Sequence, residues 1–262
     1  MIPEGYVREW KAVAPWLNDR MVEQDLVISR VLVHIFSDPG LSSALLFRGG
    51  TALHKLYLAP ASRYSEDIDL VQSQAGPIGP LFDALRDVLG SFLGKPQRKQ
   101  RPGVVALIYR IPQANASEKP LRLKVEINSR EHVVVMDVEK RPFGVASRWF
   151  TGHCDVMSYR LEELLGTKLR ALYQRRKGRD LFDLWLGLTQ GNARPEGIAM
   201  CFRRYLEASG LKVSAREFRL NMKPKLTHPD FVHDTDDLLR PGIVFDIPTA
   251  YAQLDQEILS LL

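Results

Sequence analysis

Two aspartates separated by a single residue, Asp67 and Asp69, lie in the apolar stretch "DIDLV". Alternate side chains of a β-strand share one face, so both carboxylates would point to one side while Ile68 and Leu70 point to the core. Like charges held this close are costly unless a cation lies between them, and Mg²⁺ prefers carboxylate oxygens. The pair therefore predicts a site for Mg²⁺, with Mn²⁺ as the alternative ion. The competing interpretation is an exposed strand face with scattered charges.

A second strand adds a carboxylate to this prediction. The segment "LRLKVEIN", residues 121–128, alternates apolar and polar residues, which places Glu126 on the open face with Arg122 and Lys124. If the two strands are neighbours, three carboxylates converge. We expect Glu126 to act with the two aspartates in catalysis.

The stretch "LLFRGGTALHKLY" places a Gly-Gly turn between a short apolar strand and a helix that we expect to begin at Thr51. Glycine allows close backbone approach, and the N–H groups at a helix start attract anions such as a nucleotide phosphate. Thr51 could also be a simple N-cap. A phosphate site 16 residues before a two-carboxylate metal site indicates an enzyme that uses a nucleoside triphosphate and Mg²⁺.

A later helix carries a cation where an apolar side chain is expected. In the amphipathic pattern of residues 160–176, Lys168 falls in the middle of the apolar stripe. Such a lysine either extends its ammonium to the surface or points into a cleft, where it would hold phosphate charge. Asp180 and Asp183, three residues apart on the next helix, form structural ion pairs or orient Lys168.

The elements that must position these residues follow from the same patterns. Strands are predicted at 44–48, 67–71, 104–110 and 121–128, helices at 20–36, from Thr51, at 81–93 and from 158 onward, and a basic turn at 95–103. A small mixed sheet followed by a mainly helical half is an α+β fold. We expect a catalytic domain at 1–155 and, at 156–262, a helical domain that completes the active-site cleft.

Composition excludes several classes of protein. The chain has 262 residues, with 45% hydrophobic and 26% charged residues, which is ordinary for a soluble globular protein. It shows neither a signal-peptide pattern nor an apolar run of about 20 residues. Cys154 and Cys201 make no disulfide framework and have no metal-ligand spacing. We expect a cytoplasmic protein without a membrane partner.

Charge is unevenly distributed along the chain. Residues 158–226 hold 15 Lys or Arg against 7 Asp or Glu, whereas residues 227–262 hold 1 against 7. The basic segment, which includes Arg203 and Arg204, could attract the phosphates of a polyanion. Alternatively, the acidic tail folds back over a basic surface. Charge alone leaves both interpretations open.

The motifs "RGGTALHKLY…RYSEDIDL", "LKVEIN" and "LEELLGTKLRAL…RRKGRDLFDLW" together resemble the AbiEii-type nucleotidyltransferase toxins, the family that includes the MenT toxins. Their fold is that of the DNA polymerase β-like nucleotidyltransferases, whose pattern is a Gly-Gly or Gly-Ser turn followed by Asp-x-Asp. The matching blocks span residues 45–185, about half the chain. Because four blocks occur in order, the resemblance is specific.

The resemblance implies a toxin of a type IV-like toxin–antitoxin system with a cognate antitoxin as partner. Asp67 and Asp69 would hold Mg²⁺ against a nucleoside triphosphate, and the enzyme would transfer a nucleoside monophosphate to RNA, the 3′ end of tRNA in MenT-like members. The catalytic set it implies also contains Glu126, Lys168 and Asp180. The implied nucleotide-binding set is Arg48, Gly49, Gly50, Thr51, Lys55 and Ser65.

Three other functions fit parts of the pattern. A small-molecule nucleotidyltransferase of the antibiotic-modifying type would share the fold and the two aspartates, although a basic second half suits a cationic acceptor poorly. A glycosyltransferase would use the two aspartates with Mn²⁺ and a nucleotide sugar, but no doubly wound series of strands and helices is visible. A scaffold without activity would not need Asp67, Asp69 and Lys168 together.

Overall fold

The computed structural model of the protein describes residues 2–113 and 119–262. The chain divides into two compact units. The first comprises residues 1–132 and 138–158, and the second comprises Val133–Asp137 and Tyr159–Leu262. The domain boundary predicted at 155/156 falls inside the strand that ends the first unit.

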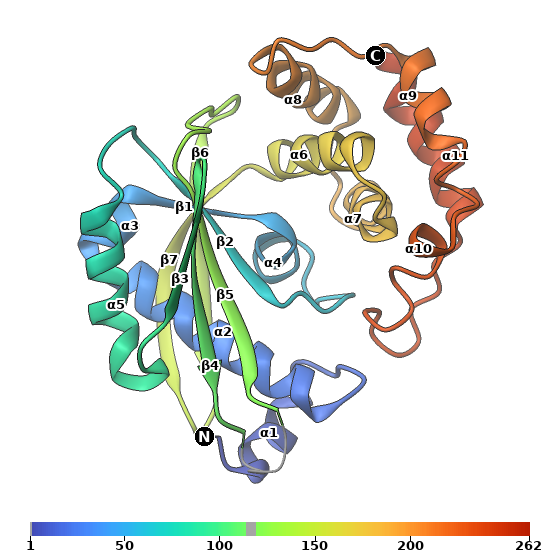
Figure 1. The fold of residues 1–262 in the computed structure, drawn as a ribbon. Helices are drawn as coiled ribbons and strands as arrows, with labels where there is room; N and C mark the ends of the chain where they lie inside the picture. Colours follow the sequence, from blue (N-terminus) through green and yellow to red (C-terminus); the bar gives the residue numbers. More distant parts are fainter. Residues whose placement is uncertain (1, 114–118) are drawn as a thin grey trace. The chain divides into compact units, whose positions relative to one another are not determined.

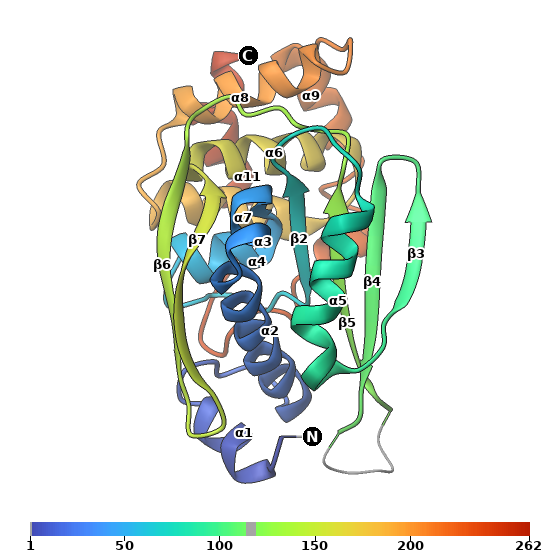
Figure 2. The ribbon, with the colours of Figure 1, turned by 90° about the vertical axis from the view of Figure 1, so that its left-hand side faces the viewer.

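The first unit is built on a seven-stranded mixed sheet, larger than the small sheet that the sequence predicts (Figures 1 and 2). Its order is β3-β4-β5-β2-β1-β7-β6. The strands are β1 (Leu45–Arg48), β2 (Asp67–Gln72), β3 (Gln97–Arg101), β4 (Val104–Ile111), β5 (Leu121–Asn128), β6 (Val138–Ala146) and β7 (Thr151–Tyr159). Strand β2 runs antiparallel to β1 and parallel to β5, so it lies in the centre of the sheet.

Helices cover one face of this sheet. Figure 2 shows α2 (Asp19–Ser37), α3 (Pro39–Ala44) and α5 (Gly79–Leu93) in front of it, and α1 (Glu4–Trp10) precedes them in the chain. Helix α2 begins where the Asn18 side chain accepts the N–H of Met21, a cap that satisfies one free donor. Most buried residues of α2, α5 and β5 are apolar, and Gln24 of α2 also donates to the carbonyl oxygen of Arg122 on β5. The opposite face therefore remains for polar side chains.

Three local predictions were wrong. Residues 95–103 contain the edge strand β3, whose five residues are all exposed, rather than only a turn. The helix after the Gly-Gly turn begins at Gly49, not at Thr51, as α4 (Gly49–Ala52), and continues as the π-helix Leu53–Tyr57. Strands β6 and β7 were not predicted.

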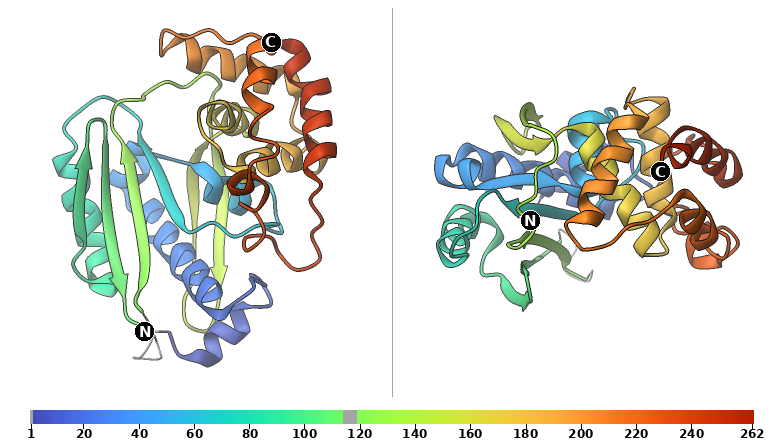
Figure 3. Two further views of the ribbon diagram at one scale, coloured as in Figure 1. Left: turned by 45° about the vertical axis from the view of Figure 1, so that its right-hand side comes forward. Right: turned by 90° about the horizontal axis from the view of Figure 1, so that it is seen from above.

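The second unit is helical (Figure 3). Its helices are α6 (Leu161–Gln174), α7 (Gly178–Thr189), α8 (Pro195–Glu207), α9 (Ala215–Met222), α10 (Pro229–Val232), α11 (Ile247–Glu257) and the 3₁₀ turn Leu259–Leu261. The α+β class expected from the sequence is thus confirmed. Within the described residues, no helix combines the length and apolar character that a membrane crossing requires.

A short segment from the middle of the chain belongs to the second unit. The buried carboxylate of Glu163 on α6 accepts the backbone N–H groups of Val135 and Met136, at 2.8 and 2.7 Å. The Tyr205 hydroxyl on α8 donates to the same carboxylate at 2.7 Å. These bonds attach residues 133–137 to α6 and α8.

Candidate active site

The predicted aspartates lie on the central strand of the sheet, on one face. In the pairing register Asp69 is opposite Arg48 on β1 and Glu126 on β5, while Asp67 is opposite Lys124. Partners in register point to the same side of a sheet, so these five side chains share a face. The sequence predicted one shared face for Asp67 and Asp69 and another for Lys124 and Glu126, on the condition that the two strands are neighbours, and the structure meets that condition.

A lysine lies among the carboxylates on this face. Lys124 Nζ lies 3.0 Å from Asp67 Oδ2 and 3.3 Å from Glu126 Oε2. Among the described residues no group of three or more His, Cys, Asp or Glu side chains is placed to hold a metal ion. The three carboxylates do lie on one face, with Glu126 in register with Asp69, but the Lys124 ammonium contacts both Glu126 and Asp67.

Burial raises the pKa of both Asp67 and Asp69, and the nearby Lys124 opposes that rise. The carboxylate oxygen Asp67 Oδ1 is buried and has no hydrogen-bond partner in the described part of the chain. Mg²⁺ is commonly bound through one or two carboxylates together with substrate phosphates. Two adjacent carboxylates with an unpartnered oxygen fit that ion.

The Gly-Gly turn packs against this strand at closer range than other residues allow. Gly49 has φ +81°, and a Cβ there would lie 2.3 Å from Asp69 Oδ2. A Cβ at Gly50 would lie 2.4 Å from a guanidinium nitrogen of Arg63. The turn therefore places backbone directly beside one carboxylate and one buried cation.

Arg63 is the site residue that sequence analysis missed. Its side chain is 2% exposed, and its Nη1 donates to the carbonyl oxygen of Tyr64 at 2.9 Å. A buried guanidinium beside a glycine turn presents several fixed donors suited to phosphate. Its position before the Asp-x-Asp motif was visible, but its burial depends on the fold and gives no local signal.

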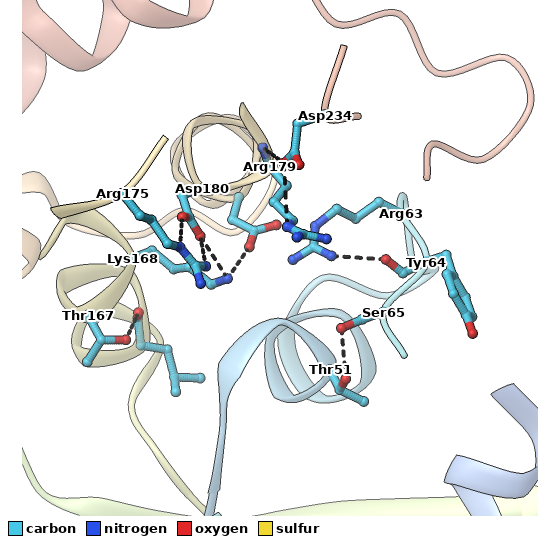
Figure 4. A network of polar contacts seen from close by, with 12 residues as sticks. Thr51, Arg63, Tyr64, Ser65, Thr167, Lys168, Arg175, Arg179, Asp180 and Asp234 are labelled. Atoms are coloured by element: carbon cyan, nitrogen blue, oxygen red, sulfur yellow. Dashed lines mark hydrogen bonds and ion pairs between the residues drawn. The ribbon is translucent and has the colours of Figure 1, made fainter. Parts of the chain in front are cut away.

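Thr51 and Ser65 connect the turn to strand β2. The two hydroxyl oxygens are 2.8 Å apart, and Thr51 also donates to the carbonyl oxygen of Asp67 (Figure 4). Because Thr51 has a single O–H, the Ser65 hydroxyl donates to Thr51. Thr51 is not an N-cap, since the cap residue of α4 is Arg48.

The structure separates the two flanking cations of the turn. Arg48 pairs with Glu131 at 2.9 Å and stays on the face of Asp69. Lys55 Nζ instead contacts both carboxylate oxygens of Asp25 and the hydroxyl of Ser29 on α2, at 3.1, 3.1 and 2.9 Å. Three contacts satisfy all three ammonium donors. These contacts hold Lys55 and the glycine turn against α2 and leave no donor of Lys55 for a nucleotide, so we remove Lys55 from the predicted nucleotide-binding set.

In the second unit, Lys168 is at the centre of a buried ion network (Figure 4). Its Nζ lies 3.2 Å from Asp180 Oδ1 and 2.8 Å from Asp183 Oδ2, and both aspartates are fully buried. Arg175 also donates to Asp180, at 2.6 and 2.8 Å. Despite burial, the charges of Lys168 and Arg175 lower the pKa of Asp180. The two sequence-based interpretations of Asp180 and Asp183 are therefore compatible: they form ion pairs, and those pairs orient Lys168.

The acidic tail neutralises much of the basic segment within the second unit. Arg176 pairs with Asp230, Lys177 and Arg179 pair with Asp234, and Arg219 pairs with Asp255. Arg204 pairs with Glu207, and Arg203 donates to the carbonyl oxygen of Leu261. These Lys and Arg side chains, which could have bound a polyanion, are therefore already paired with carboxylates or a carbonyl oxygen of the same unit.

One family model matches most of the chain, and solved structures share its fold. The family model described as "Nucleotidyl transferase AbiEii toxin, Type IV TA system" matches residues 30–249. The chain is similar in structure to MenT4, a nucleotidyltransferase toxin from Mycobacterium tuberculosis H37Rv, with a TM-score of 0.67 and 14% identity, covering 100% of this chain and 90% of that one. It is also similar to JHP933 from Helicobacter pylori, with a TM-score of 0.56 and 18% identity over 92% and 91% of the two chains. Among curated proteins no sequence matches significantly.

Proposed function

Because the chain belongs to the AbiEii family of nucleotidyltransferase toxins of type IV toxin–antitoxin systems, we propose that it transfers a nucleoside monophosphate from a nucleoside triphosphate to an RNA acceptor, the 3′ end of tRNA. The observation that carries the proposal is the contact of the Gly49 backbone with the Asp69 carboxylate. It brings the glycine turn, which suits a phosphate, directly beside the carboxylates that suit a divalent ion.

In this proposal the chain's residues position the reactants. The acceptor hydroxyl oxygen forms a bond to the α-phosphorus, the bond from that phosphorus to its bridging oxygen breaks, and pyrophosphate leaves. Asp67 and Asp69 would hold Mg²⁺, or Mn²⁺ as the alternative, which when bound neutralises phosphate charge. The amides of Gly49 and Gly50 would hold the terminal phosphates, and the guanidinium of Arg63, which lies beside Gly50, would add positive charge there.

The remaining predicted residues take supporting roles. Thr51 and Ser65 hold the glycine turn against Asp67, and Arg48 supplies positive charge beside Asp69. The ammonium of Lys124 contacts the carboxylates of Asp67 and Glu126 and balances their negative charges. The role of Lys168 on phosphate charge, with Asp180 orienting it, stays a prediction that substitution can test. A cognate antitoxin is the partner that membership of the family implies.

The test is transfer from labelled nucleoside triphosphates to total tRNA, with and without Mg²⁺, by the wild type and by Asp67→Asn. We expect label at the tRNA 3′ end only with wild type and divalent ion. The alternative is a small-molecule acceptor of the antibiotic-modifying type, tested by replacing tRNA with aminoglycosides. Label on the small molecule but not on tRNA would overturn the RNA proposal. Growth arrest that requires Asp67 would separate a toxin from a housekeeping enzyme.

A further inference from the structure

The outer half of the sheet in the first unit carries a row of cations on the face of the catalytic aspartates. Asp67 is in register with Lys124 on β5, so Arg122, two residues earlier on β5, shares this face. Arg110 on β4 is opposite Arg122. On β3, Lys99 and Arg101 are opposite Ala106 and Val104, which in turn are opposite Glu126 and Asn128. The register therefore extends one face from Asp67 to the sheet edge.

These four cations have no partner within the described part of the chain. Lys99, Arg101, Arg110 and Arg122 are all exposed, and none of them has an ion pair or side-chain hydrogen bond to a described residue. Residues 95–130 hold nine Lys or Arg and only two Asp or Glu. This density exceeds that of residues 158–226, where tail carboxylates and carbonyl oxygens take up many of the cations.

We propose that this basic sheet face (Lys99, Arg101, Arg110 and Arg122) binds the sugar-phosphate backbone of the RNA acceptor; the inference rests on the proposed function. Adjacent strands are about 4.8 Å apart, and side chains on one face of a strand repeat about every 7 Å. Arg122 lies one strand over from Asp67 and two residues along it, about 8 Å away, while Lys99 is level with Asp69 but three strand spacings, about 14 Å, away. An acceptor whose 3′ hydroxyl reaches Asp67 has its preceding phosphates over this face.

The chemistry of the face suits phosphate without base readout. Long, exposed Lys and Arg side chains neutralise phosphates regardless of sequence, and their binding weakens with salt. Strand β3 has no buried residue, so it contributes little apolar packing and presents mainly its charges. Its other face differs, because Arg98 lies over the Phe82 ring at 4.8 Å and donates to Gln100.

The experiment compares two paired variants, Lys99→Gln/Arg101→Gln and Arg110→Gln/Arg122→Gln, in the full chain. Arg98→Gln is the control on the same strand but the opposite face. Arg203→Gln/Arg204→Gln removes equal charge from the second unit. Binding of total tRNA is titrated across a salt series, and transfer kinetics are measured with labelled nucleoside triphosphate. Circular dichroism melts establish that each variant is folded.

We expect each paired variant on the basic sheet face to raise the KM for tRNA on the order of tenfold and to reduce the salt slope by about 0.7 for each lost phosphate contact. The kcat, the KM for the nucleotide and both controls should match the wild type. If wild type labels tRNA and the paired variants behave like the controls, the inference is wrong while the proposed function stands.

Two further outcomes are separable. If wild type labels no RNA, the proposed function is wrong. The salt series then tests by itself whether the basic sheet face binds tRNA, and equal tRNA binding by wild type and the paired variants overturns the inference. If the paired variants keep normal tRNA kinetics but escape neutralisation by the cognate antitoxin, the face binds a protein instead, and the inference is again overturned.

Discussion

Lys124 Nζ lies 3.0 Å from the carboxylate of Asp67, on the face where a divalent cation is proposed to bind. The two residues are in register on parallel strands, so the contact is fixed by the sheet. The carboxylates raise the pKa of Lys124 against the effect of burial, and the lysine stays charged at neutral pH. The site therefore contains its own counter-ion for the aspartates.

Lys124→Gln removes this counter-ion. We expect the variant to bind Mn²⁺ more tightly than the wild type, because no ammonium competes for Asp67, and to unfold at lower temperature without metal, because the carboxylates repel each other. Calorimetry with Mn²⁺ and thermal melts in EDTA measure the two effects. Arg110→Gln, which removes an exposed cation from the same face of the sheet, should change neither. Weaker Mn²⁺ binding by Lys124→Gln would contradict this role.

Asp67→Asn and Asp69→Asn should reduce transfer to below about a tenth of the wild-type rate, since the amides are poor ligands for a hard cation. Their stability should change in the opposite direction. Burial raises the pKa of both carboxyl groups. Their stabilising contribution to the free energy of unfolding is therefore present below about pH 4, where they are protonated, and is lost as the pH rises through the raised pKa.

At pH 7 the Asn variants should therefore melt higher than the wild type in EDTA, and the difference should shrink as the pH falls toward 4. Melts across this pH range, run beside the transfer assay, measure both quantities. An Asn variant with more than about a tenth of wild-type activity would remove that aspartate from the proposed metal site.

Gly49→Ala should abolish transfer by displacing Asp69, because the new Cβ would lie 2.3 Å from the carboxylate oxygen. Gly94→Ala is the matched control. Gly94 has φ +74°, close to the +81° of Gly49, but a Cβ at Gly94 would meet nothing within 4 Å. Both variants should lose about 1–3 kcal/mol of stability, because a positive φ strains a residue that carries a Cβ. Equal activity of the two variants would show that the Gly49–Asp69 contact does not matter for catalysis.

Lys168→Met should destabilise the protein by about 3–5 kcal/mol, because it leaves two fully buried aspartates with one partner fewer. If Lys168 acts on phosphate charge, transfer should fall by about 10²–10³. The double variant Lys168→Met/Asp183→Asn removes one buried charge as well and should recover part of the stability. Recovery of transfer by the double variant would assign Lys168 a purely structural role.

Much of the candidate site could be predicted because its signals are local. The alternation of Asp67 with Ile68 and of Glu126 with its apolar neighbours indicates both strand and face. The Gly-Gly turn is equally visible in the sequence. The adjacency of β2 and β5 was only a condition of that prediction, and the structure meets it.

The rest depends on contacts distant in sequence. Strand β3 has no apolar residue and is defined by backbone pairing with β4, so no hydrophobic period indicates it. The partner of Lys55 is Asp25 on α2, 30 residues away, and the burial of Arg63 exists only once the fold forms. Strands β6 and β7 bury few of their residues, so their sequences lack a strong period of two.

The attachment of residues 133–137 to the second unit has a consequence for the order of synthesis. The backbone N–H groups of Val135 and Met136 have their partner in Glu163, which is oriented by Tyr205, about 70 residues later in the chain. Chains generally fold from the N-terminus as they leave the ribosome. Here the segment between β5 and β6 remains without Glu163 until α6 has emerged, and Glu163 remains without Tyr205 until α8 has emerged. A nascent chain released at Tyr159 would contain every strand of the sheet and both aspartates, yet carry this segment undocked.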